Sequence, residues 1–493
     1  MAQILIAAAH KSSGKTTVTL GLARALRNQG LTVQTFKKGP DYIDPMWHAR
    51  ATGRPAYNLD FNTQSHSEII DMLAARSNGA DISLIEANMG LYDGVDLEGR
   101  DGNAALAKLT STPVILVVDT EGMTRGIAPL LLGYRVFDPE VHLAGVVLNR
   151  VAGARHEEKL RAAVERYTEV PVIGALPREQ ELMLPERHLG LTTPAETDAV
   201  EAFIARIGER VAARFDLETV KGIAKLAPPP FPPMRHRPSA PATIVSDQRV
   251  KIAVARDAAF GFYYPDDLEA FRAAGADLGF FDAMRDQHLP AADGLFIGGG
   301  FPETHMAALE ANATLRAEIR AAIENGLPTY AECGGLMYLT RAIRWGEARA
   351  EMVGVIDAEA VMHVKPQGRG QVIVAETEEF PWPEVVAHGQ ARRDGTHAHE
   401  FHHAALVQLS ADTRYALEMR RGTGIDGRHD GILVHNTLAA FSHQRATAAN
   451  PWVERFVAFV RQVRAGVGQE SVHELASVTA DRTLRSVPSA SSP

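Results

Sequence analysis

The chain has 493 residues, of which 45% are hydrophobic and 23% charged, and its formal net charge is −9. This length and apolar content predict about two to four domains rather than one. Charges of both signs occur throughout and no basic stripe stands out, which argues against nucleic acid as a partner. Because Cys333 is the single cysteine, an intrachain disulfide is excluded.

The first apolar stretch, residues 4–9, is shorter than a signal-peptide core and runs directly into His10 and Lys11. No segment is apolar for long enough to span a membrane. We therefore expect a cytoplasmic protein without a membrane partner. The sequence leaves the oligomeric state open, with a homodimer among the alternatives.

Short apolar segments alternate with amphipathic helices in the first half of the chain. This pattern predicts a mostly parallel sheet with helices on both faces, an α/β fold. The predicted strands are residues 4–8, 32–36, 82–85, 114–118 and 143–148.

A proline-rich stretch at residues 227–249 can form neither a helix interior nor a sheet ladder, and it predicts a domain linker. A new strand begins at Lys251, and the segments 293–300 and 327–331 continue a second α/β alternation to about Arg464. We expect a first domain at 1–226, a second at 250–464, and a flexible tail at 465–493.

A phosphate-binding loop is predicted directly after the first strand. The run from Ala9 to Thr17, Ala-His-Lys-Ser-Ser-Gly-Lys-Thr-Thr, lies between that strand and an amphipathic helix. In such a loop the backbone N–H groups face the phosphates, a lysine contacts the β- and γ-oxygens, and a hydroxyl binds Mg²⁺. The predicted residues for ATP are Gly14, Lys15, Thr16 and Thr17, with Thr16 also on the metal.

Two further segments, 37–45 and 84–94, follow the second and third strands, where ligands bind in open α/β sheets. Glu86 closes an apolar strand, as expected of a carboxylate that holds Mg²⁺, and Asp41 is a second candidate. A solvated loop acid is the alternative for both. The spacing around Asp93 favours a plain turn aspartate. Lys37 and Lys38 either neutralise an anionic substrate or the transferring phosphoryl group, or form a solvated face.

The second half carries a candidate nucleophile. Cys333 follows an apolar run and precedes Gly334 and Gly335, a pattern typical of a turn from strand to helix. There the thiolate lies near a helix N-terminus and backbone N–H groups can hold an oxyanion. The alternative is a buried, inert cysteine, but the two glycines favour the nucleophile.

His443, at the end of the apolar run 438–445, is the candidate base for this cysteine; a hydrogen-bonded histidine at a strand end is the alternative. The histidine-rich run 396–403 suggests zinc by its spacing, but no second ligand group accompanies it, so a substrate-facing strand is favoured.

Several motifs occurring in one order resemble the cobyrinic acid a,c-diamide synthase family of glutamine-dependent tetrapyrrole amidases. The resemblance covers about residues 1–460. It rests on the segments 38–45 with His48, 53–55, 58–60, 89–94, 133–134 with 137–139, 171–177, 187–191, 297–303 and 333–335.

The resemblance implies an ATP-binding domain like dethiobiotin synthetase joined to a class I glutamine amidotransferase domain, with glutamine, Mg-ATP and a polycarboxylated tetrapyrrole as ligands. It implies that Cys333 attacks glutamine, that His443 relays the proton, and that Asp93 handles substrate, in contrast to the turn aspartate that spacing favours. The remaining residues expected on the substrate are Lys38, Asp41, Tyr42 and Asp44, and those expected around the oxyanion are Gly298, Gly299 and Gly334.

The chain departs from the family pattern at two places. Ala398 stands where a glycine is common, and Arg445 stands where amidotransferase triads place an acid, so the group that orients His443 is left unnamed. The default acceptor is cobyrinic or hydrogenobyrinic acid. The runs 7–16 and 122–129 look closer to relatives that amidate sirohaem, and nickel-sirohydrochlorin is a third acceptor. A regulatory nucleotide-binding protein is the non-enzymatic alternative, disfavoured by an intact Cys333 and His443.

Overall fold

The computed structural model describes residues 2–182, 184, 186–187, 190–196, 199–228, 249–384 and 395–466. The chain divides into two compact units. Nearly all of the predicted linker and of the predicted tail lies outside the described residues, so the predicted domain boundaries stay predictions.

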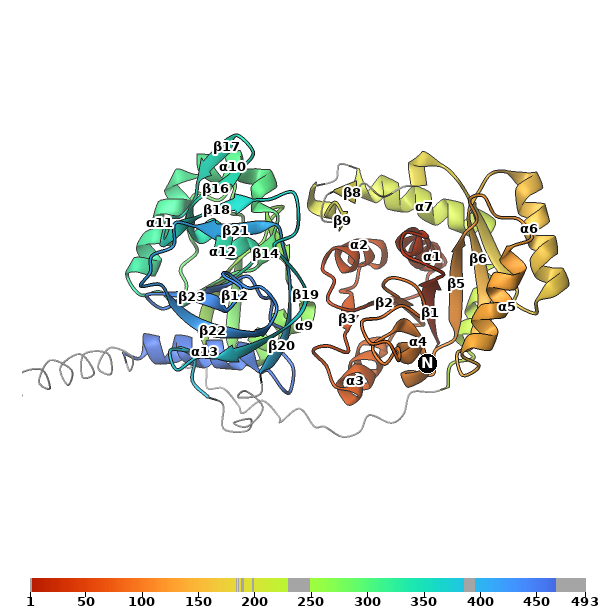
Figure 1. The fold of residues 1–493 in the computed structure, drawn as a ribbon, viewed down its shortest axis with the longest axis horizontal. Coiled ribbons are helices and arrows are strands. Elements are labelled where there is room, and N and C mark those ends of the chain that lie inside the picture. The colour runs from red at the N-terminus through yellow and green to blue at the C-terminus, as the bar shows by residue number, and fades with distance from the viewer. Residues whose placement is uncertain are drawn as a thin grey trace, which may run out of the picture. The chain divides into compact units, whose positions relative to one another are not determined.

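The first unit is built on a parallel sheet of seven strands in the order β3-β2-β4-β1-β5-β6-β7 (Figure 1). The five predicted strands are all present, but β2 continues to Lys38, past the predicted end at residue 36, and β3 and β7 are additional. The bounds are β1 Gln3–Ala8, β2 Val33–Lys38, β3 Tyr57–Leu59, β4 Ile82–Glu86, β5 Val114–Asp119, β6 Leu143–Val151 and β7 Val172–Pro177.

Helices cover both faces of this sheet because its central strands are apolar on both sides. In β1, Ile4 and Ile6 enter one core while Leu5 and Ala7 enter the other. The first core also takes residues from α1 Lys15–Asn28, α2 Ile43–Thr52, α7 Val200–Arg214 and α8 Leu217–Ala224. The second takes them from α3 His66–Ser77, α4 Asn103–Leu109, α5 Ile127–Phe137 and α6 Ala154–Tyr167. Short elements complete the unit: η1 Gln180–Leu182, β8 Glu186–Arg187, β9 Gly190–Leu191 and η2 Pro194–Glu196.

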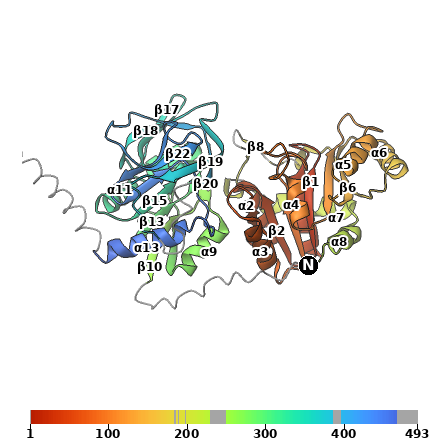
Figure 2. The same ribbon diagram turned by 60° about the horizontal axis from the view of Figure 1, so that its bottom comes forward.

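The second unit contains a nine-stranded sheet in the order β12-β10-β13-β15-β24-β23-β22-β19-β20 (Figure 2). The five strands from β12 to β24 are parallel, and the four beyond them are antiparallel, which the predicted α/β alternation did not anticipate. The bounds are β10 Val250–Ala255, β12 Ala276–Phe281, β13 Gly294–Ile297, β15 Thr329–Glu332, β19 Gly368–Glu376, β20 Thr396–His402, β22 Arg414–Arg421, β23 His429–Val434 and β24 Thr437–Ala440.

Within the described residues, two smaller sheets, five α-helices and one 3-10 helix complete this unit. The four-stranded sheet has the order β17-β16-β18-β21, and β11 pairs with β14. The strands are β11 Phe260–Phe262, β14 Gly299–Gly300, β16 Thr340–Trp345, β17 Ala348–Glu351, β18 Ile356–Met362 and β21 Ala404–Val407. The helices are α9 Pro265–Ala273, η4 Pro302–His305, α10 Met306–Ala311, α11 Ala313–Glu324, α12 Gly334–Leu339 and α13 Trp452–Arg464.

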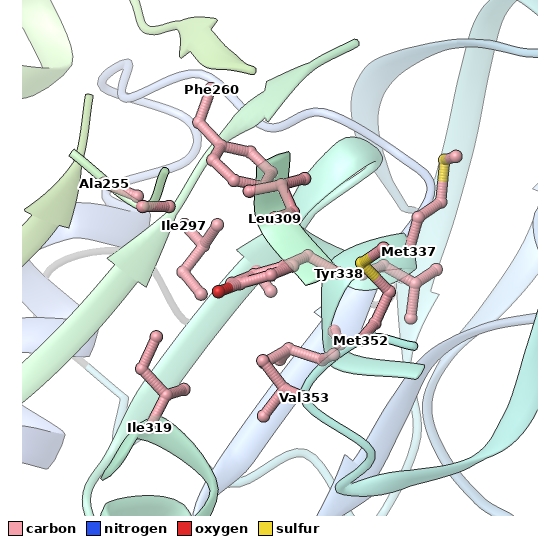
Figure 3. Close-up of a cluster of buried hydrophobic side chains, with 14 of the residues drawn as sticks. Ala255, Phe260, Ile297, Leu309, Ile319, Met337, Tyr338, Met352 and Val353 are labelled. Carbon is pink, nitrogen blue, oxygen red and sulfur yellow. The ribbon is translucent and has the colours of Figure 1, made fainter. Parts of the chain in front are cut away.

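Helix α12, the short helix after Cys333, is held firmly by apolar packing. All six of its residues are buried. Figure 3 shows Tyr338 among Phe260, Ile297 and Val353, and its ring centroid lies 5.2 Å from that of Phe260. Because each large apolar side chain contributes about 1.5–3 kcal/mol when fully buried, this helix is a rigid support for the residue before it.

Among the described residues, no helix combines the length and the apolar character needed to cross a membrane.

Candidate active site

The predicted phosphate-binding loop connects β1 to α1. Gly14, the residue before the helix, has φ 91°, a left-handed conformation that favours glycine. A Cβ added there would lie 2.1 Å from Nδ2 of Asn149. That amide group donates a hydrogen bond of 2.8 Å to the carbonyl oxygen of Ser13. Asn149, from β6, therefore fixes the loop and requires glycine at position 14.

The first residues of α1 direct their side chains to different partners. Lys15 Nζ donates to the Met89 carbonyl oxygen at 2.6 Å. Burial, followed by the charge of Lys37, lowers the pKa of Lys15 to about 8. The Thr16 hydroxyl donates to Glu86 Oε1 at 2.8 Å, whereas Thr17 contacts the carbonyl oxygen of Leu182 at 3.4 Å.

Glu86 is the centre of the polar network in this unit. It ends β4 and is fully buried. Lys37 Nζ donates to its Oε1 at 2.8 Å, and His48 Nε2 lies 2.6 Å from its Oε2. Burial alone would raise the pKa of Glu86, but Lys37 and His48 outweigh it and hold that pKa well below its usual range. Glu86 is therefore ionised at neutral pH.

Neither Lys37 nor His48 was among the residues predicted to bind the metal or nucleotide. The sequence predicts for Lys37 either a contact to an anionic substrate or the transferring phosphoryl group, or a solvated face, and it includes His48 only as part of a motif. The solvated face is wrong, because Lys37 is buried. The available signal was position: Lys37 lies in β2, next to β4, and is paired in register with Glu86. A buried glutamate at a strand end requires close partners of this kind, because an unpaired buried carboxylate is costly.

Asp44 and Asp41 lie on the other side of Lys37. The Lys37 ammonium forms an ion pair with the Asp44 carboxylate, and its nitrogen is 4.0 Å from Asp41 Oδ2. The backbone N–H of Asp44 donates to Asp41 Oδ1 at 3.0 Å. Burial and then the charge of Asp41 raise the pKa of Asp44 to about 7, although Lys37 acts against this. The structure thus brings three acids, Asp41, Asp44 and Glu86, around one lysine.

Lys38 is the next residue along β2, and its environment differs. Its side chain is buried, and within the part of the chain described its ammonium forms no side-chain hydrogen bond or ion pair. Burial lowers its pKa, and the more distant Asp60 and Asp101 act against that effect. A buried lysine without a close anion is suited to an anionic ligand.

The surroundings of Tyr42 and Asp93, the remaining residues predicted to contact substrate, do not point to a ligand. Tyr42 is buried at the start of α2. Asp93 accepts a hydrogen bond of 3.0 Å from the backbone N–H of Gly90, as a turn aspartate does. A substrate contact for either residue stays a prediction.

The oxygen atoms of Thr16 and Glu86 suit Mg²⁺, which prefers oxygen ligands and takes the rest from phosphates and water. The described residues contain no group of three or more His, Cys, Asp or Glu side chains able to hold a metal by themselves. Residues 396–402 of the histidine-rich run form β20, at the edge of the nine-stranded sheet, and His403 follows it.

In the second unit, Cys333 lies in the predicted turn between strand β15 and helix α12. Its φ of 47° and ψ of −99° are a strained combination for a residue with a side chain. The backbone N–H donates to the Ala440 carbonyl oxygen at 2.7 Å, which fixes the turn against β24. The Cys333 side chain is buried. Backbone strain at a rigidly supported turn between a strand and a helix is nevertheless characteristic of a nucleophile position.

The two glycines after Cys333 are required by close packing. A Cβ at Gly335 would lie 2.2 Å from the Ile297 carbonyl oxygen, and one at Gly334 would lie 3.0 Å from the Gly300 backbone nitrogen. The segment 297–300 therefore lies directly against the start of α12. The predicted oxyanion residues Gly298, Gly299 and Gly334 come from these two segments, and their role stays a prediction.

His443 reaches Cys333 because β15 and β24 are parallel neighbours, so both residues lie beyond the same ends of their strands. Its Nδ1 lies 3.4 Å from Oε2 of Glu332, and the Cys333 side chain interacts with the imidazole electrostatically. Burial lowers the pKa of His443, but these two groups outweigh it and raise the pKa to about 10. His399 stacks on His443 with ring centroids 4.8 Å apart, and their backbones form an antiparallel bridge.

Comparison with known proteins finds a family model that matches each half of the chain. Residues 4–191 match the CobQ/CobB/MinD/ParA nucleotide binding domain, and residues 251–451 match the CobB/CobQ-like glutamine amidotransferase domain. A cobyrinate a,c-diamide synthase of Magnetococcus marinus is 41% identical over 93% of this chain and 97% of its own length. The chain belongs to the cobyrinate a,c-diamide synthase family.

Further relatives with the same name support this assignment. The protein from Archaeoglobus fulgidus is 38% identical over 92% of this chain and 96% of its own, and that from Listeria monocytogenes serotype 4b is 40% identical over 90% and 96%. Family membership confirms the predicted fold class and the prediction of a glutamine-dependent amide ligase with a nucleotide-binding domain. It also argues against the purely regulatory alternative.

Proposed function

We propose that this protein uses ATP and glutamine to amidate the a and c side-chain carboxylates of cobyrinic or hydrogenobyrinic acid in cobalamin biosynthesis. The observation that carries the proposal is the match to relatives named cobyrinate a,c-diamide synthase over nearly the whole length of both chains. The network around Glu86 and the pair Cys333 and His443 supply the chemistry.

In the glutaminase reaction, the Cys333 thiolate attacks the side-chain amide carbon of glutamine. The tetrahedral intermediate collapses when His443 gives a proton to the leaving nitrogen, so ammonia departs and a glutamyl thioester remains. Water then hydrolyses the thioester to glutamate and restores the thiol. Backbone N–H groups of Gly298, Gly299 and Gly334 would stabilise the oxyanion.

In the first unit, Lys15 and the N-terminus of α1 would hold the phosphates of ATP, while Thr16 and Glu86 would hold Mg²⁺, which neutralises phosphate charge. The substrate carboxylate attacks the γ-phosphorus and displaces ADP, giving an acyl phosphate. Ammonia attacks the acyl carbon, phosphate leaves, and an amide remains. The buried ammonium of Lys38 would bind one of the many carboxylates of the acceptor.

The test is mass spectrometry of cobyrinic acid, hydrogenobyrinic acid and sirohaem after incubation with the purified protein, glutamine and Mg-ATP. Two added amides on a corrin are expected. Amidation of sirohaem alone would show that the acceptor is sirohaem and not a corrin. The absence of an amide on all three acceptors would overturn the proposal.

A further inference from the structure

The geometry points to Glu332, the residue directly before the nucleophile, as the acid that orients His443. It would act as a positioning residue in place of an acid two positions after the histidine. The inference rests on the proposed glutaminase reaction at Cys333 and deepens it.

The position two residues after His443 cannot supply an acid. Arg445 stands there, and its side chain is almost fully buried. A guanidinium has five donors and no acceptor, so it cannot accept a proton or hydrogen bond from the imidazole. The orienting group must therefore come from another element.

Glu332 has the geometry that this role requires. Its Oε2 lies 3.4 Å from Nδ1 of His443, and both side chains are buried. Its other oxygen, Oε1, accepts hydrogen bonds from the Tyr330 hydroxyl at 2.7 Å and from the Gln444 backbone N–H at 3.0 Å. One carboxylate oxygen is thus fixed by two donors, which aims the second at the imidazole.

The donors to Glu332 are themselves held in place. The Tyr330 hydroxyl accepts a hydrogen bond of 3.0 Å from Gln444 Nε2. Tyr330 is fully buried, and its ring packs against Phe296 and Trp452 at centroid distances of 5.6 and 5.0 Å. The carboxylate therefore belongs to a rigid core and not to a mobile loop.

Asp430 and His399 also lie near the histidine segment, but neither offers an acceptor to the His443 Nδ1. Asp430 accepts from the backbone N–H groups of Phe441 and Ser442 and from the Ser442 hydroxyl. His399 stacks on the face of the His443 ring, where it cannot accept an in-plane N–H bond, and burial keeps its pKa well below the usual range. Glu332 is the carboxylate that faces the Nδ1 edge.

This arrangement has a chemical consequence. A carboxylate at Nδ1 fixes which ring nitrogen faces Cys333 and stabilises the imidazolium that forms beside the thiolate. Because Glu332 and Cys333 are adjacent in sequence, a single strand end supplies both the nucleophile and the acid that orients its base.

The experiment compares the wild-type protein with Glu332→Gln, which keeps the side-chain shape and removes the charge. Glutamate release from glutamine is measured across pH, without a tetrapyrrole. We expect kcat to fall by about 10²–10⁴-fold with KM changed less than about threefold, as when a triad acid is replaced by its amide. The pH limit set by the imidazolium should move downward, a change that a merely structural role would not cause.

Glu359→Gln is the matched control, because Glu359 is a buried, ion-paired glutamate in a different sheet of the same unit. It should leave glutaminase activity unchanged. Tyr330→Phe is a second variant that keeps the carboxylate but removes one of its donors, and it should lower kcat by about tenfold. An unchanged kcat and pH profile in Glu332→Gln, or an unchanged kcat in folded Tyr330→Phe if Glu332→Gln does not fold, overturns the inference.

Failure of the proposed function gives a different result. If the acceptor assignment is wrong, the wild type still releases glutamate but forms no corrin amide. If the inference is wrong, the wild type performs both reactions and the Glu332 variant matches it in glutamate release.

Discussion

The hydroxyl group of Thr16 and the carboxylate of Glu86 are joined by a hydrogen bond of 2.8 Å, although 70 residues separate them. The contact joins the start of α1, the helix that follows β1, to the end of β4, the strand next to β1 in the sheet. Both groups carry oxygen atoms that suit Mg²⁺, the ion that we propose they hold together with ATP.

Thr16→Ala should therefore abolish ATP-dependent amidation while sparing glutamate release. We expect the amidation rate to fall by about 10²–10³-fold, because one oxygen ligand near the transferring phosphoryl group is removed. The contacts of Glu86 with Lys37 and His48 should remain. Amide formation with free ammonia measures the effect. Thr19→Val, which removes a hydroxyl bonded to the Lys15 carbonyl oxygen in the same helix, is the control. Equal losses in both variants would contradict the metal assignment.

Gly14→Ala tests the requirement for glycine in the phosphate loop. The added Cβ meets the Asn149 amide, and φ is unfavourable, so ATP binding should be lost and the unfolding free energy should fall by more than about 1 kcal/mol. Gly30→Ala is a matched control, since its φ of 86° is similar but nothing lies within 4 Å of the new Cβ. Calorimetric titration with ATP should show binding only to the control.

Cys333→Ala separates the two half-reactions. Without the thiolate, glutamine-dependent amidation should fall by about 10³-fold or more, whereas amidation with ammonium chloride should continue at the wild-type rate. Mass spectrometry of the acceptor under both nitrogen sources measures this. Loss of both activities in a folded variant would contradict the assignment of the cysteine to glutamine alone.

The raised pKa of His443 predicts a defined pH dependence of stability. The folded-state value of about 10 exceeds the unfolded value of about 6.5, so the folded protein binds the extra proton between them. The resulting stabilisation is fully present below about pH 6.5 and is lost as pH rises through about 10. Urea unfolding measures the free energy of unfolding of the wild type and of His443→Gln. The difference between the two should shrink as pH rises from about 6.5 to about 10. A difference that does not change with pH would argue against the protonated imidazole.

Lys38→Met tests the buried lysine that lacks a close anion. Removing its charge should raise KM for the tetrapyrrole by about tenfold or more while leaving glutamate release unchanged, since a buried charged contact is lost. The control is Lys108→Met, which removes a lysine on α4 that forms an ion pair with Asp138, and it should leave KM unchanged. Initial rates at varied acceptor concentration distinguish the two variants.

The sequence by itself determined the local features of this protein. The sequence shows two such features, the strand–loop–helix pattern around Gly14 and the Cys-Gly-Gly turn. Each depends only on residues close together in the chain: an apolar strand, and glycines that can adopt a left-handed backbone conformation or that lack a Cβ. The order of the motifs was sufficient to indicate the family, which the comparisons then established.

Only the tertiary structure decided which ionisable side chains lie in contact. His48 lies on Glu86, and Glu332 lies beside His443, 111 positions further along the chain, because sheet order and parallel register bring distant strand ends together. Local spacing carries no information about such pairs. A buried charge is costly unless it has a partner, and the fold determines which side chain lies close enough to be that partner.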